Sequence, residues 1–242
     1  MEGALVSRND RKLYLARYSR PAASREEGVK KSGSTRKKLR QDWNRLSAAG
    51  EVYVENQRDG LKACDAFETF LTLEERSWKG KAGTALLCNK RDAAFTRQWF
   101  AQLAADGSAS VALLIIDGRP IAAQVLLYCG STAYTWKTAF DAEFSKFSPG
   151  ALLVGKVTEG LFGESDISEI DSCSAVEGFM AGLWTGRRAV IDMLVAVDPH
   201  WSASFVIERF GEALRVRVLD LRDWIRGLQA SSGKKAGVSP SA

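Results

Sequence analysis

The sequence predicts an α+β fold in which a mixed, mainly antiparallel central sheet is flanked by helices and followed by a long C-terminal helix. Two amphipathic helical segments precede the strongest strand signals. Three apolar runs then follow one another across tight turns, and helical and strand patterns alternate after them. With 242 residues, 45% hydrophobic and 26% charged, the chain is long enough to bury one sizeable core.

The helices are recognised by apolar side chains that recur three or four positions apart. The first places Leu39, Trp43 and Leu46 on one face and ends at Gly50, a residue suited to a helix C-terminus. The expected helices cover residues 35–49, 61–78, 92–105, 149–162, 178–187 and 202–228.

The strands are β-branched or apolar runs bounded by turn residues. Asp117-Gly118 and Gly130-Ser131 separate three of these runs, and such short turns join antiparallel neighbours. The expected strands cover residues 51–55, 111–116, 121–129, 132–140, 167–175 and 190–197, with a further short strand and a linker before residue 29.

The expected domain organisation is one main domain with short appendages. The main domain covers residues 29–200, after an N-terminal remnant or linker over residues 1–28. Residues 201–230 form the C-terminal helix. Residues 231–242 are rich in Ser, Gly and Lys and form a disordered tail.

Several classes of protein are disfavoured by composition. No apolar run approaches the roughly 20 residues of a membrane span, and the N-terminus lacks the apolar centre of a secretory signal, so we expect a cytoplasmic protein. The four cysteines are widely separated and His200 is the single histidine. We therefore expect neither a disulfide framework nor a metal cofactor.

The positive charge is concentrated near the N-terminus. Residues 1–45 hold 13 Lys and Arg against 5 Asp and Glu, so the rest of the chain carries −3 of the total net charge of +5. Much of this charge lies on the helix over residues 35–49. It is either a binding surface for a phosphate-bearing partner or a solvated helix face.

The segment Ser148-Pro149-Gly150 indicates an anion-binding helix start. Ser148 is a suitable N-cap, Pro149 has the φ of a first helical residue, and Gly150 leaves room against the backbone. The free amides and the dipole of such a helix attract phosphate. The alternative is a well-capped core helix without a ligand.

The order of these elements resembles the GNAT acyltransferase superfamily. Within it, the sequence is similar to the cellulose-biosynthesis type of acetyltransferase domain, which is related to the FemAB peptidyltransferases. The resemblance covers residues 30–197 and is carried by Arg36-Lys37-Lys38-Leu39-Arg40, Ile115–Ala122, Asp141, Ser148–Leu153 and Ile170-Asp171.

The resemblance implies an N- or O-acyltransferase that uses acetyl-CoA or another acyl-CoA as co-substrate. The cofactor pyrophosphate would lie at the helix start after the third strand of the meander. The residues expected to contact it are Lys146, Ser148, Pro149, Gly150 and Ala151. Pro149 has no amide hydrogen, so Ser148, Gly150 and Ala151 would supply the backbone donors.

The candidate catalytic residues are Asp141 and Asp171 as general bases, with Lys137 as a charge partner. Each is alternatively a structural ion pair or a cap at a strand end. Strict alternation along the strand would put Lys137 and Asp141 on one face. The other face would then carry Tyr134, Trp136 and Thr138.

The chain departs from the resembled family in two places. Many relatives have a Tyr-Lys pair after the strand of Asp171, whereas residues 178–184 here contain no phenol. The chain also begins only about thirty residues before the basic helix, where relatives usually carry another GNAT-like half.

Three functions stay open. The first is acyl transfer to a small metabolite or envelope glycan precursor, by a monomer or homodimer. The second is a FemAB-like aminoacyl transferase that uses charged tRNA, the only option involving nucleic acid. The third is a truncated, non-catalytic domain.

Overall fold

The protein is described by a computed structural model, which covers residues 12–26, 33–163, 166–174, 179–195, 203–212, 214–215 and 217–218. The chain divides into two compact units: residues 19–188 form one, and residues 1–18 with 189–242 form the other. Residues 203–212 are helical. His200, the end of the predicted C-terminal helix and the predicted tail lie outside the described residues.

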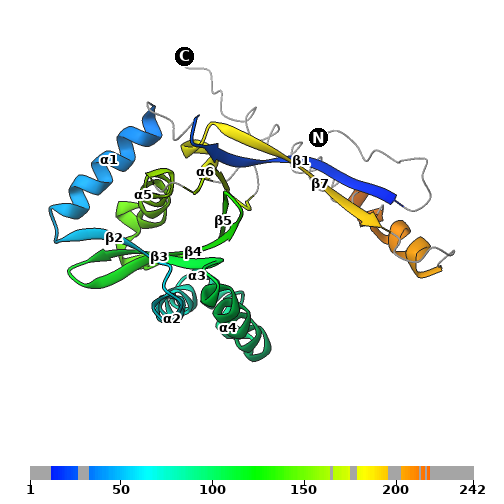
Figure 1. The fold of residues 1–242 in the computed structure, drawn as a ribbon, viewed down its shortest axis with the longest axis horizontal. Helices are drawn as coiled ribbons and strands as arrows, with labels where there is room; N and C mark the ends of the chain where they lie inside the picture. The colour runs from blue at the N-terminus through cyan, green and yellow to red at the C-terminus, as the bar shows by residue number, and fades with distance from the viewer. Residues whose placement is uncertain are drawn as a thin grey trace, which may run out of the picture. The chain divides into compact units, whose positions relative to one another are not determined.

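The strands form a seven-stranded sheet, of which β2 to β6 lie wholly within the larger unit (Figure 1). Its strand order is β2-β3-β4-β5-β6-β1-β7, and β5 and β6 form a parallel pair. The strands are β1 (Lys12–Ser24), β2 (Val52–Gln57), β3 (Ala109–Ile116), β4 (Arg119–Cys129), β5 (Thr132–Phe140), β6 (Glu169–Asp171) and β7 (Gly186–Val195). The predicted mixed, mainly antiparallel sheet with flanking helices is confirmed.

Helices cover both faces of this sheet in the larger unit (Figure 1). The α-helices are α1 (Ser34–Ser47), α2 (Gly60–Arg76), α3 (Trp78–Lys81), α4 (Lys90–Ala105), α5 (Pro149–Gly163) and α6 (Met180–Leu183), and the 3-10 helices are η1 (Leu86–Cys88) and η2 (Ala142–Phe147). The predicted turn between the first two strands of the meander is present. Asp117 and Gly118 both have positive φ, as a tight two-residue hairpin turn requires.

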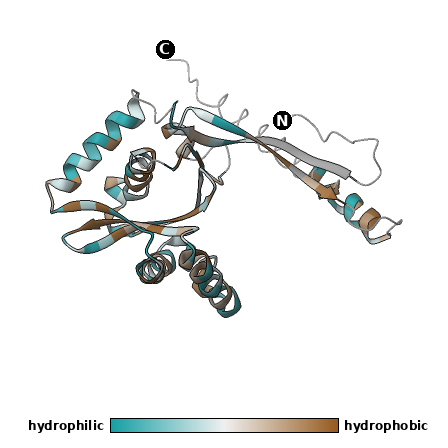
Figure 2. Cartoon of the chain, viewed as in Figure 1, coloured by the Kyte–Doolittle hydropathy of each residue, from teal (hydrophilic) through white to brown (hydrophobic). Residues whose placement is uncertain are grey.

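Two apolar clusters lie on opposite faces of the sheet. On one face α2 and α4 pack through Phe67 and Phe100, whose ring centroids are 4.2 Å apart. On the other face α5 contributes Leu153 and Leu161, with Trp184 beside them. Figure 2 shows that α1, which lies next to α5, is largely hydrophilic. Helix α1 is therefore anchored by few apolar residues and leaves most of its charged surface outside the core.

One predicted feature of β5 is wrong. Val125 pairs with Lys137 and Leu126 pairs with Thr135, so Trp136 is an extra residue in a β-bulge. A bulge breaks the alternation of side chains along a strand. Trp136 therefore packs against Trp99 of α4, on the face that Lys137 also occupies, whereas Thr138 faces α5.

The strand that follows α5 is shorter than predicted. Only residues 169–171 form β6, against the predicted 167–175, and Cys173 has a φ of 48°, which ends the extended conformation. Because the pairing of β5 with β6 is limited to Thr132–Tyr134, the rest of β5 runs on without this parallel neighbour.

Candidate functional site

The start of α5 lies directly after η2, at the end of the meander. Ser148 has a left-handed conformation, with a φ of 52° and a ψ of 49°. Its carbonyl accepts the amides of Ala151 and Leu152 at 3.0 Å each, and its own amide donates to Ser145. Of the three amides proposed as phosphate donors, only that of Gly150 has no hydrogen bond among the described residues.

Gly150 also allows α5 to approach β5 closely. A Cβ at this position would lie 3.3 Å from Cδ1 of Phe140 and 3.6 Å from Cγ2 of Thr138. Gly150 is buried, and the side that lacks a Cβ faces the sheet. A contact between Gly150 and a cofactor stays a prediction that depends on its backbone amide.

Three cations surround the start of α5. Nζ of Lys38 donates to Oγ of Ser148 at 2.6 Å. The guanidinium of Arg45 and Nζ of Lys146 lie 5.5 Å and 5.0 Å from the ring centroid of Phe147. The positive end of the helix dipole and these side chains together favour an anion at this place.

Helix α1 holds two of these cations in position through one buried carboxylate. Asp42 is 3% exposed and accepts from Nζ of Lys38 at 2.9 Å and from Nη1 of Arg45 at 3.4 Å. Sequence reasoning did not single out Lys38, Asp42 or Arg45 for this site. Their spacing along α1 puts them on one face, but no sequence signal shows that this face meets α5.

Asp141 has two structural partners. Its Oδ1 accepts the amide of Glu143 at 3.0 Å and thereby caps η2. Its Oδ2 pairs with Nη2 of Arg119 at 2.5 Å, and Arg119 also contacts Glu143 at 2.8 Å. The hydrogen bonds from Arg119 to Glu143 and Asp141 raise the pKa of the guanidinium.

Asp171 lies at the end of β6, where the two parallel strands part. It pairs with Tyr134 in the sheet and is 3% exposed. Its Oδ1 accepts the amide of Cys173 at 2.8 Å, and its Oδ2 lies 3.5 Å from Nη1 of Arg188. Asp171 is thus a buried carboxylate at the last residue of β6 that pairs with β5.

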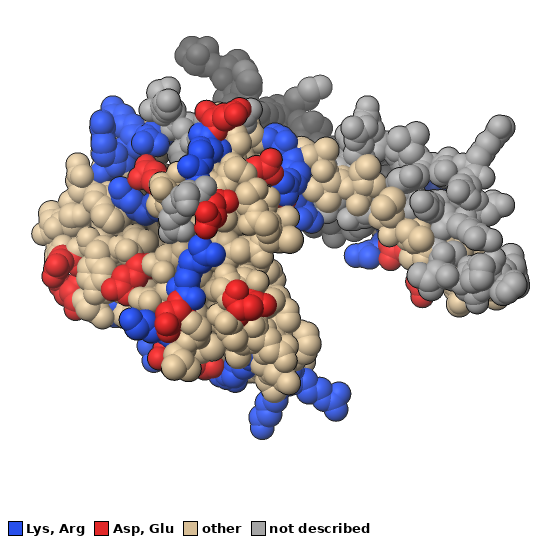
Figure 3. Space-filling model, viewed as in Figure 1, with Lys and Arg blue, Asp and Glu red and all other residues tan. Residues whose placement is uncertain are grey.

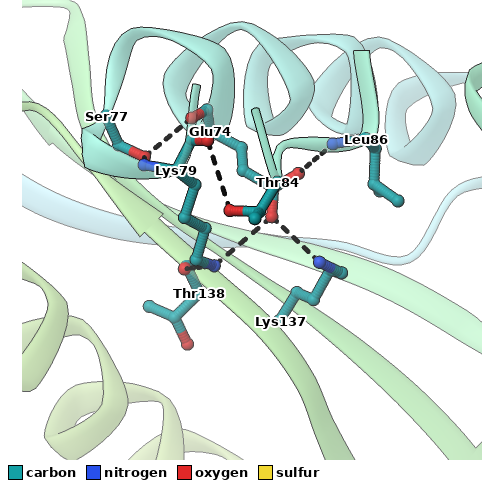
Figure 4. A network of polar contacts seen from close by, with 7 residues as sticks. All are labelled: Glu74, Ser77, Lys79, Thr84, Leu86, Lys137 and Thr138. Atoms are coloured by element: carbon teal, nitrogen blue, oxygen red, sulfur yellow. Dashed lines mark hydrogen bonds and ion pairs between the residues drawn. The ribbon is translucent and has the colours of Figure 1, made fainter. Parts of the chain in front are cut away.

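Lys137 belongs to an ion network around the buried Glu74, on the sheet face that α2 covers (Figure 4). Its Nζ donates to Oε1 of Glu74 at 3.0 Å, and Lys79 reaches the same oxygen at 3.3 Å. Oε2 of Glu74 accepts the amide of Leu86 at 2.9 Å, while Lys79 donates to the carbonyl of Thr138 at 3.1 Å. Helices α2 and α3 are therefore tied to the part of β5 that lies beyond β6.

The electrostatics of this network keep Glu74 ionised. Its side chain is fully buried, and burial by itself would raise the pKa. The hydrogen bond from the Leu86 amide and the ammonium of Lys137 outweigh burial, so the pKa of Glu74 lies below its ordinary value. Sequence reasoning missed Glu74, because nothing distinguishes it from exposed Glu75 beside it.

The structure does not join the three candidate catalytic residues to one another. Within the described residues, no hydrogen bond or ion pair connects Asp141, Asp171 and Lys137 in any combination. Their assigned roles stay predictions. The described residues also contain no group of three side chains suited to hold a metal ion, and none of their helices is both long and apolar enough to cross a bilayer.

Comparison with known protein families identifies the type of domain. The family described as "Acetyltransferase (GNAT) domain" matches residues 33–180, which is more than half of the chain. No curated protein sequence gives a significant match.

Several solved structures are similar at low sequence identity. FemX is 13% identical, with a TM-score of 0.48 over 66% of this chain and 55% of that chain. The C-terminal domain of a putative lysylphosphatidylglycerol synthetase from Agrobacterium fabrum is 17% identical, with a TM-score of 0.46 over 70% and 48%. An aminoglycoside acetyltransferase from an uncultured soil metagenomic sample, in complex with sisomicin, is 12% identical, with a TM-score of 0.38 over 54% and 83%. The chain spans about half the length of the first two.

Proposed function

The chain belongs to the GNAT acetyltransferase domain family, and from this premise we propose that it transfers an acetyl or other acyl group from acyl-CoA to an amine or hydroxyl. The acceptor would be a small metabolite or an envelope glycan precursor, as in the cellulose-biosynthesis type of domain that the sequence resembles. The observation that carries the proposal is the start of α5, where a free amide and three cations converge.

The residues at this start fit the pyrophosphate of acyl-CoA. The amide of Gly150 supplies a backbone donor, and Lys38 and Lys146 supply charge. Lys38 already donates to a hydroxyl oxygen of Ser148, which shows that its ammonium reaches the helix start. A phosphate there would gain charge-assisted hydrogen bonds, which are the stronger class.

Transfer requires the acceptor nitrogen or oxygen to attack the thioester carbon. A carbon–nitrogen or carbon–oxygen bond forms, the carbon–sulfur bond breaks, and the acceptor loses a proton to a base. Asp171 is the proposed base, because it ends β6 where that strand leaves β5. Asp141 is the second candidate for the base. Lys137 would act as a charge partner through its ion pair with Glu74.

The leaving thiolate needs a proton from another source. Within α6 and its flanks, Phe179, Met180 and Trp184 offer no acidic hydroxyl, and the Trp184 indole donates to Oγ1 of Thr158 at 3.2 Å. We therefore place no protein acid at this position, and solvent is the proposed proton donor.

Titration calorimetry with acetyl-CoA tests the proposal. Lys38→Gln and Lys146→Gln should each weaken acetyl-CoA binding roughly tenfold, because each removes a charged partner of phosphate. Lys62→Gln, at an exposed position of α2, is the matched control and should leave the affinity unchanged. Absence of binding by acetyl-CoA and longer acyl-CoAs to the wild-type protein would contradict the proposal.

A further inference from the structure

A cavity of about 580 Å³ lies between α1, α5 and α6, next to the start of α5. Its part of α5 runs from Leu152 to Glu159, and none of Ser148, Gly150 or Lys146 lines it. Gly155, near the middle of this stretch, is seven residues beyond Ser148, which corresponds to about 10 Å along the helix. The volume lies within the range of roughly 300–1,000 Å³ that is typical of small-molecule sites.

One part of the cavity wall is apolar. Leu39 and Trp43 of α1 face Leu152 of α5 and Leu183 of α6, and the two latter side chains are buried. The indole of Trp43 is partly exposed, and Nζ of Lys156 lies 4.9 Å from its ring centroid, so the apolar wall borders directly on a cation.

The rest of the wall is strongly basic. Arg36, Lys37, Arg40 and Lys156 line the cavity with one carboxylate, Glu159, which leaves a formal excess of three positive charges. Glu159 accepts from Arg36 at 3.4 Å and from Lys156 at 3.3 Å. Figure 3 shows Lys and Arg gathered over α1. Within the described residues, no ion pair involves Lys37 or Arg40, and both side chains are exposed.

Gly155 lines the cavity without a side chain that would occupy it. A Cβ at this position would meet no atom within 4 Å, so the absence of a side chain does not serve packing. Glycine in a helix interior costs about 1 kcal/mol relative to alanine. Here it exposes the surface of α5 to a molecule in the cavity.

We propose that this cavity binds a small phosphorylated molecule with an apolar or aromatic body. The body would lie against Trp43 and Leu152, and its phosphates would meet Arg36, Lys37 and Arg40. A nucleoside diphosphate and a short prenyl diphosphate share this chemistry. The site is additional to the proposed acyl-CoA site and does not depend on it.

Calorimetry with uridine diphosphate and with geranyl diphosphate tests the site. Gly155→Leu fills the cavity and should weaken the bound probe at least about tenfold, because the leucine occupies the ligand's volume. Gly160→Leu is the matched control, since Gly160 is exposed on the same helix, has no atom within 4 Å of its Cβ position and does not line the cavity. It should change the affinity less than about twofold, in line with ordinary surface substitutions. Equal melting temperatures of the two variants show that both are folded.

Comparison of uridine diphosphate with geranyl diphosphate shows whether the cavity prefers a nucleoside or a prenyl group. Inorganic pyrophosphate, which has neither group, measures how much that group adds to the affinity. Arg40→Gln should weaken binding of the probe severalfold, whereas Arg91→Gln, at an exposed position of α4, should leave the affinity unchanged. The proposal is overturned if neither probe binds, if Gly155→Leu and Gly160→Leu behave alike, or if pyrophosphate binds as tightly as both probes.

Acetyl-CoA titrated into Gly155→Leu separates the two proposals. Unchanged acetyl-CoA affinity together with loss of the probe supports a second site. Loss of both ligands shows that the cavity belongs to the acyl-CoA site and overturns the inference. Binding of a probe without any binding of acetyl-CoA overturns the proposed function and leaves this site standing.

Discussion

At the scale of single residues, Glu74 is less exposed than any other charged side chain of the described residues. It is a fully buried carboxylate that one backbone amide and two lysines satisfy. Lys137, proposed from the sequence as a catalytic partner, contributes to this network instead of contacting Asp141. The network holds β5 just where that strand loses its parallel neighbour, so the contacts of Lys137 tie this part of the strand to α2.

Glu74→Gln should destabilise the protein by about 1.5–3 kcal/mol, since it weakens the charge-assisted hydrogen bonds from the partly exposed ammonium groups of Lys79 and Lys137. Urea unfolding followed by circular dichroism measures this difference. The control is Glu75→Gln, which changes an exposed neighbour on the same helix. Equal stability of the two variants would contradict the role assigned to the network.

Glu74 also predicts how stability depends on pH. Its pKa in the folded protein is lowered, whereas an unfolded glutamate titrates near 4.3. Its contribution is therefore fully present above about pH 5 and is lost as the pH falls through the folded value. The wild-type protein should lose stability over this acid range more steeply than Glu74→Gln, as melting temperatures at successive pH values would show. Parallel profiles would contradict the prediction.

At the scale of elements, the sequence predicted what local chemistry determines. The two-residue turn at Asp117-Gly118, the helix start at Pro149 and the helices predicted over residues 35–49, 61–78, 92–105 and 149–162 are present near the expected residues. The helix predicted over residues 178–187 is limited to Met180–Leu183, because the strand β7 already begins at Gly186. The face assignments in β5 failed, because the bulge at Trp136 is set by pairing with β4. The cations from α1 at the start of α5 were likewise not predictable, since they depend on how two distant helices pack.

The connection from α2 to α3 should be intolerant of any side chain at Gly80. A Cβ there would lie 1.7 Å from the carbonyl oxygen of Glu75, so the backbone of α3 must move. Gly80→Ala should cost about 2 kcal/mol or more and should displace Lys79 from Glu74. Gly160→Ala, at a position without neighbours, should be neutral or stabilising by up to about 1 kcal/mol. Urea unfolding compares the two variants, and equal destabilisation by both would show that Gly80 is not held against α2.

At the scale of the whole molecule, the net charge of +5 is less informative than its location. The basic side chains of α1 serve two places: Lys38 and Arg45 lie at the start of α5, and Arg36, Lys37 and Arg40 line the cavity. One helix therefore presents cations to both proposed anion sites. The same surface is what the aminoacyl-tRNA alternative would require.

Salt dependence distinguishes acyl-CoA from charged tRNA. A protein that neutralises six to ten phosphates of a nucleic acid loses about 10³–10⁵ in affinity between roughly 50 and 200 mM salt. Acyl-CoA offers few phosphates to the start of α5, so its affinity should fall far less over this range. We expect calorimetry at rising salt to show acetyl-CoA still bound at about 200 mM, where tRNA held only by α1 has dissociated.

Lys37→Gln should weaken the binding of tRNA and leave the affinity for acetyl-CoA unchanged, because Lys37 lines the cavity and not the helix start. Binding of aminoacyl-tRNA that persists at this salt, with no binding of acetyl-CoA, would favour the aminoacyl transferase over the acyl-CoA enzyme.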